Sequence, residues 1–107
     1  MIHLPLLRAG KPYKSLDRVQ VKHIATGEPF VEVSQANRGL IARDLNRMEH
    51  NKRQLLDIPV AELIAICKRA AAFFSDAELP LGDDGQTPGD YIEQVSATTG
   101  LPQALAR

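Results

Sequence analysis

The 107-residue sequence contains no tryptophan and only one cysteine, Cys67. A single cysteine cannot form an intramolecular disulfide, which is typical of proteins from a reducing compartment. No run of about 18 apolar residues is present, so we expect no membrane-spanning segment. The first residues lack the basic and apolar stretches of a secretory signal peptide. Together these absences predict a cytoplasmic protein.

The sequence also lacks a net charge, because 13 basic residues balance 13 acidic ones. A balanced chain creates no long-range field that attracts nucleic acid or an anionic membrane, so neither is expected as a partner. The charge is nevertheless divided along the chain, since residues 38–53 carry +3 and residues 76–107 carry −5. We interpret the two segments either as solvated faces or as surfaces that dock on each other, within this chain or with another.

No catalytic, cofactor-binding or metal-binding motif is complete in this sequence. A glycine-rich phosphate loop and a nucleophile elbow are both missing. The acidic residues Asp83, Asp84 and Asp90 do not follow the order of a calcium loop. The histidines also lack the spacing of zinc ligands. They are His3, His23 and His50. We therefore predict no catalytic, cofactor or metal site residues in this segment.

The first part of the chain, residues 1–36, has the pattern of β-structure. Val19 and Val21 alternate with polar residues, a glycine-containing turn follows, and a second β-type run begins near Pro29. This pattern predicts a β-hairpin, with Pro29 at the start of its second strand. Residues 2–8 are apolar but contain Pro5, which predicts an edge strand or an extended arm.

The second part, residues 37–107, has the pattern of three to four helices, so the expected fold class is α+β. The first helix should begin after Ser34 or Asn37 and run to about Asn51. A loop is expected over residues 78–90, and a short helix should follow that has Thr87 as its cap and Pro88 at its first position. A last helix should start within residues 101–107.

The strongest helical pattern follows Pro59, which fits the first helical position because its missing N–H costs nothing there. Its apolar residues form a stripe so wide that we expect burial on more than one side. Cys67 lies on this stripe. A nucleophilic thiol needs exposure and an electropositive setting, so we expect Cys67 to be buried and chemically inert.

The predicted hairpin resembles the N-terminal signature of the aldehyde dehydrogenase superfamily. The match is carried by Ala25-Thr26-Gly27-Glu28 and the β-run that ends at Val33, whereas His23 and Ile24 stand where asparagine and proline are usual. Residues 91–102 are similar to the early region of divergent, acyl-CoA-reductase-like members. The usual helix with a tryptophan is missing.

The resemblance implies that this chain is the N-terminal piece of a larger α/β oxidoreductase. Such an enzyme oxidises or reduces an aldehyde or acyl-CoA with NAD or NADP, and its nucleophile and cofactor contacts lie outside this segment. The implied role is scaffold and oligomerisation surface, with the remainder of the polypeptide and further copies as partners. The isolated chain is expected to be inactive. The alternatives are a stand-alone protein–protein interaction module and, less favoured, a small enzyme or nucleic-acid binder.

Overall fold

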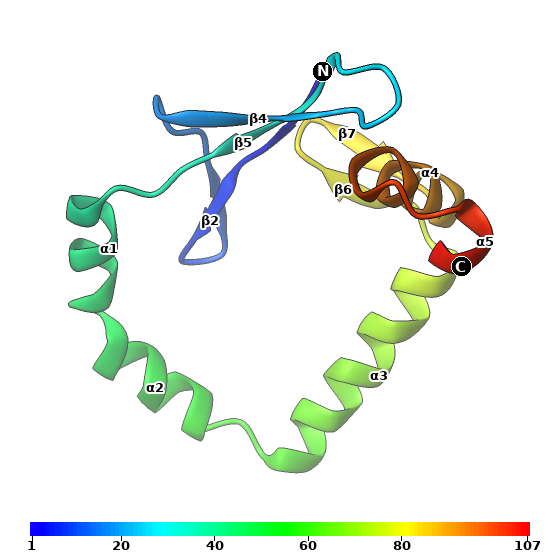
Figure 1. Cartoon of the computed structure of the whole chain (residues 1–107). Helices are drawn as coiled ribbons and strands as arrows, with labels where there is room; N and C mark the ends of the chain where they lie inside the picture. The colour runs from blue at the N-terminus through cyan, green and yellow to red at the C-terminus, as the bar shows by residue number, and fades with distance from the viewer.

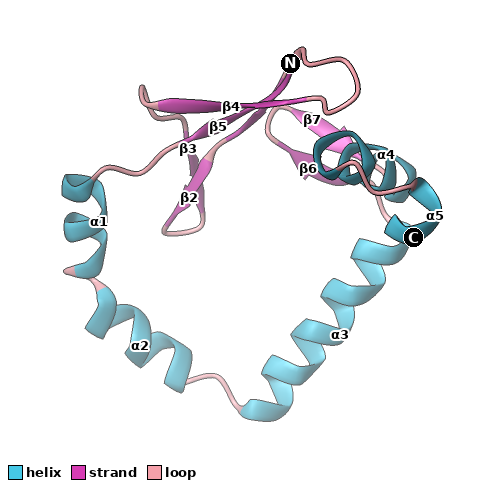
Figure 2. Cartoon of the chain, in the orientation of Figure 1, coloured by secondary structure: helices cyan, strands magenta, loops and turns pink.

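The computed structural model describes all 107 residues, and its mixture of strands and helices confirms the α+β class. The strands lie together at one side of the molecule, and three helices trace an open arc away from them and back (Figure 1, Figure 2). In chain order the strands are β1 (Ile2–Leu4), β2 (Leu6–Arg8), β3 (Lys11–Tyr13), β4 (Arg18–Lys22), β5 (Pro29–Ser34), β6 (Leu79–Leu81) and β7 (Asp84–Gln86). The helices are α1 (Arg38–Leu45), α2 (Met48–Leu56), α3 (Val60–Asp76), α4 (Pro88–Thr99) and α5 (Gln103–Ala106).

The main sheet has three strands in the order β1-β5-β4. β4 and β5 form the predicted antiparallel hairpin, with Val21 opposite Val31 and Pro29 as the first residue of β5. β1 adds to the other side of β5 in parallel, with Ile2 opposite Val31. The edge strand predicted over residues 2–8 is therefore present only at Ile2–Leu4, because the chain divides at Pro5 and residues 6–8 pair elsewhere.

Two further hairpins are small, and the second corrects a prediction. β2 and β3 are joined by Ala9 and Gly10, both with positive φ, the pattern of a type I′ turn. β6 and β7 lie within residues 78–90, where we expected only a loop. Their turn has a positive φ only at Gly82, the pattern of a type II′ turn. A side chain at Gly82 would overlap the backbone carbonyl of His3, so β1 helps to hold this hairpin.

The first helical region is two helices, where the sequence predicted one. Asn37 caps α1, as expected, by accepting a hydrogen bond from the Leu40 N–H at 2.8 Å. The chain then tightens, because the Arg47 N–H bonds to the carbonyl of Asp44, three residues back, and α2 starts anew. The predicted place of Pro59 is also wrong by one position. Its ψ of 145° is extended, so it precedes α3 as the N-cap.

α4 has the cap that the sequence predicts. The Thr87 hydroxyl accepts from the Asp90 N–H at 3.1 Å, and the Asp90 carboxylate accepts from the Thr87 N–H at 2.9 Å. This reciprocal pair is a capping box, and Pro88 occupies the first turn. Gly100 ends the helix with a φ of 77°, a conformation that favours glycine.

The apolar core lies between the sheet and α4, and it is small. Val31 is the only buried apolar side chain in the chain. Apolar residues of β1, β5, β6 and α4 surround a space of about 280 Å³ between these elements. They include Leu4, Val33, Leu81 and Val95.

The predicted burial of α3 is wrong, because none of its residues is buried. Cys67 is exposed as well. The pattern of the helix is amphipathic, but the described chain brings no element against most of its length, and only its end reaches α4. There Phe74 and Tyr91 meet edge to face at 5.1 Å. None of the five helices has both the length and the apolar character needed to cross a bilayer.

Candidate functional site

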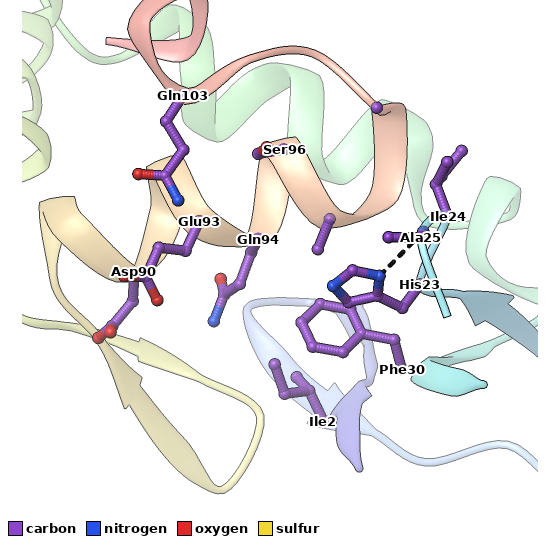
Figure 3. A pocket seen from close by; sticks show the side chains of 12 residues that line it. Ile2, His23, Ile24, Ala25, Phe30, Asp90, Glu93, Gln94, Ser96 and Gln103 are labelled. Atoms are coloured by element: carbon purple, nitrogen blue, oxygen red, sulfur yellow. Dashed lines mark hydrogen bonds between the residues drawn. The ribbon is translucent and has the colours of Figure 1, made fainter. Parts of the chain in front are cut away.

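The largest cavity of the molecule lies between the β4–β5 connection and α4 (Figure 3). Its volume is about 710 Å³. Side chains from β1, the β4–β5 connection, β5, α4 and α5 line it. Its aromatic and polar lining includes His23, Phe30, Asp90, Glu93, Gln94 and Gln103.

The hairpin end of the cavity is built around His23. Its ring meets the ring of Phe30 edge to face, with the centroids 5.6 Å apart. The backbone N–H of Ala25 donates to His23 Nδ1 at 3.1 Å, which holds the ring against the turn. The Ile24 N–H donates to the carbonyl of Ala97 at 2.8 Å, which fixes the hairpin end on α4. The end of the β4–β5 hairpin therefore forms one wall of the cavity.

The other end of the cavity is acidic. Asp90 is held by the capping box, and its hydrogen bonds with the backbone and side chain of Thr87 lower the pKa of the carboxyl. Glu93 lies three residues further along α4 and forms no ion pair within the chain. Figure 3 shows Asp90 and Glu93 at the end away from His23, with Gln94 between them and the aromatic pair.

This arrangement suits a cation better than an anion. Carboxylates and amide oxygens accept hydrogen bonds from an ammonium or guanidinium, and an aromatic ring offers a further favourable contact. A phosphate would meet like charge from Asp90 and Glu93. Among the lining residues Ser96 has a hydroxyl, but no base is bonded to it, so the cavity holds no activated nucleophile. No cluster of three or more metal-ligating side chains is present in the chain.

A second polar group joins β1, β5 and the segment before β4. His3 Nε2 lies 3.0 Å from Ser34 Oγ, and His3 Nδ1 lies 3.0 Å from Glu32. Arg18 contacts the same Glu32 oxygen at 3.1 Å. The hydrogen bond with His3, with Arg18 in support, lowers the pKa of Glu32. The Ser15 N–H donates to Ser34 Oγ at 3.0 Å.

The order Ser34–His3–Glu32 is that of a nucleophile, its base and an orienting acid. Ser34 is only 2% exposed, however, and its oxygen is already occupied by the N–H of Ser15. None of the cavities is lined by any of these three side chains. The group therefore stabilises the sheet and has no access to a substrate.

The residues singled out from the sequence do not come together. His3 belongs to the sheet network, His23 to the cavity and His50 to α2. Asp83 forms an ion pair with Lys14 at 2.7 Å, which lowers the pKa of Asp83. Asp90 caps α4.

The role of His23 and Glu93 in one cavity was missed by sequence reasoning. They lie about 70 residues apart, as the printed sequence shows, and no local pattern links them. Their elements are brought together by tertiary contacts, among them the hydrogen bond between Ile24 and Ala97.

Comparisons with family models, with characterised proteins and with solved structures find no match for this chain. The resemblance to the aldehyde dehydrogenases therefore depends on its own residues, above all on the turn 25–28.

Proposed function

We propose that this chain is a scaffold and assembly segment whose apolar faces are covered by further polypeptide. One observation carries the proposal. The chain exposes 8347 Å² of surface. A compact monomer of 11.8 kDa exposes about 5,900 Å² by the usual size scaling, so roughly 2,400 Å² is in excess.

The shape of the chain agrees with this excess. The radius of gyration is 16.9 Å, whereas a compact chain of this length has about 13 Å. The excess area is several times the roughly 800 Å² that each partner buries in a stable complex. The open arc of α1, α2 and α3 therefore has enough surface for an obligate interface.

The chemistry of the exposed surface supports the same role. Val60, Ile64, Phe73 and Phe74 of α3 are each more than half exposed. Apolar area of this extent marks an interaction surface. An amphipathic helix of 17 residues that packs on its own chain only at its end is best explained by a partner elsewhere.

The family of the larger protein is proposed from the resemblance of the hairpin. On that basis, the larger protein is a cytoplasmic, NAD(P)-dependent aldehyde dehydrogenase or acyl-CoA reductase. On this proposal the nucleophile and the cofactor contacts lie outside the segment, in keeping with a cavity that offers carboxylates where a dinucleotide would need phosphate-binding groups. The alternative remains a stand-alone interaction module, which the well-capped α4 and its docked hairpin favour.

Light scattering and binding of an apolar dye to the 107-residue chain test the assembly role. We expect self-association or strong dye binding, and a smaller effect in the variant Ile64→Lys/Phe73→Lys. A monodisperse monomer that binds no dye would favour the stand-alone module.

An assay of the natural gene product tests the family. We expect NAD(P)-dependent turnover of an aldehyde or acyl-CoA, and none from residues 1–107 alone. Turnover that depends on Cys67 in the isolated chain would contradict the proposal. An inactive gene product would remove the family and leave the assembly role standing.

A further inference from the structure

We propose that the cavity beside α4 receives basic side chains from α1 and α2 of a second copy of this chain. The inference rests on the proposed assembly role and names the partner. The two surfaces involved are the acidic wall, formed by α4 at the cavity, and the basic arm, formed by α1 and α2.

The charges left unpaired within one chain are complementary. The four ion pairs of the chain use Arg8, Lys14, Arg18 and His3 as their basic members. None of them uses the basic side chains of the arm, from Arg38 onward. These are exposed and comprise Arg38, Arg43, Arg47, Lys52 and Arg53. On the other side, Glu93 of the wall has no ion-pair partner either.

The cavity has the groups that recognise a guanidinium. Glu93 supplies a free carboxylate, and Gln103 of α5 supplies an amide group that also lines the cavity. The amide oxygen of Gln94 already accepts from Gln86 Nε2, so a guanidinium would be its second donor. Phe30 offers the aromatic ring on which a guanidinium stacks. The segment around the cavity also attracts a cation electrostatically, because residues 76–107 carry a net charge of −5.

The arm and the wall lie on opposite sides of the open arc, so one chain does not join them (Figure 1). A second copy supplies the arm that the wall of the first copy lacks. Related by a two-fold axis, each copy places its arm on the wall of the other, and two equivalent contacts close the dimer. The excess surface of the chain is more than such a dimer requires.

Sedimentation velocity of the 107-residue chain tests the contact. The variant Lys52→Glu/Arg53→Glu reverses the charge at the end of the arm, and Glu93→Lys reverses the charge of the free carboxylate on the wall. Each variant alone should dimerise roughly tenfold or more weakly, because like charges then face each other. The matched control is Lys68→Glu/Arg69→Glu, which makes the same change of charge on α3, outside the arm and the wall, and should weaken dimerisation far less than the arm variant does.

Mixing the two variants is the decisive step. In the mixed dimer the reversed arm faces the reversed wall and the native arm faces the native wall, so association should return. The wild-type dimer should also weaken as salt rises from about 0.05 to about 0.5 M. If each charge-reversed variant dimerises as strongly as the wild type, and mixing them changes nothing, the arm–wall contact is contradicted and the assembly role is not. A monomer at every salt concentration that also binds no apolar dye overturns the assembly role with it.

Discussion

Ser34 is the most deeply buried side chain of the chain, and its hydroxyl accepts the buried N–H of Ser15. We predict that Ser34→Ala lowers the free energy of unfolding by about 1–3 kcal/mol, because that N–H loses its partner. Urea unfolding followed by circular dichroism measures the loss. Ser75→Ala, which removes an exposed hydroxyl on α3, should change the value by less than about 0.5 kcal/mol. Equal losses in the two variants would show that the hydrogen bond between Ser15 and Ser34 does not contribute to stability.

Comparing Gly82 with Gly27 distinguishes the cost of backbone strain from the cost of a steric overlap. Both have a positive φ, so alanine at either position is strained by about 1–2 kcal/mol. Around Gly27 a methyl group meets open space, whereas at Gly82 it meets the His3 carbonyl. We predict that Gly82→Ala costs about 1–3 kcal/mol more than Gly27→Ala, as overpacking does. Thermal unfolding of the two variants side by side checks this, and equal midpoints would contradict the contact between β6–β7 and β1.

At the scale of elements, one ion pair connects the β2–β3 hairpin to α1. Arg8 donates twice to Asp44, with both distances at 2.8 Å. This hydrogen-bonded pair lowers the pKa of Asp44 from its usual value of 3.8. A lowered carboxyl pKa stabilises the folded chain above the unfolded value, and the stabilisation disappears as pH falls through the folded value.

We therefore predict that α1 loosens from the hairpin only below about pH 4. A carboxyl titration of Asp44 by NMR should give a pKa below 3.8, and Arg8→Gln should raise it. Lys14→Gln is the control, because it removes the pair with Asp83 and should leave Asp44 unchanged. A pKa of Asp44 that does not respond to Arg8→Gln would contradict the predicted link.

Elements with local signals were predictable from the sequence, and elements held by distant contacts were not. The β4–β5 hairpin has alternation and turn residues, and the start of α4 has a hydroxyl and a proline at the right spacing. β6–β7 contains Pro80 and Gly85, which are typical of a loop, and packing on β1 allows it to pair. The cavity joins residues from both ends of the chain, so no local pattern could reveal it.

At the scale of the whole molecule, Cys67 reports whether α3 is covered. The amphipathic pattern predicted burial, and the single chain leaves the thiol exposed, because burial of a helix depends on a partner. We predict that a thiol reagent labels Cys67 rapidly in the dissociated chain. Labelling should slow when α3 is covered in the assembled protein. Cys67→Ser is the control for background, and equal rates in both states would mean that α3 stays open.

The parallel pairing of β1 with β5 also has a consequence for synthesis of the chain. Leu4 of β1 pairs with Val33 of β5, so β1, the first strand of the sheet to be synthesised, cannot pair until β5, the last, has been made. At about 5–20 residues per second, the ribosome takes roughly 1.5–6 s to make the residues between them. The β4–β5 hairpin closes in microseconds once its own residues have emerged after that interval. β1 therefore adds to a β4–β5 hairpin that has already formed. Until then the apolar side chains of β1 are available to chaperones.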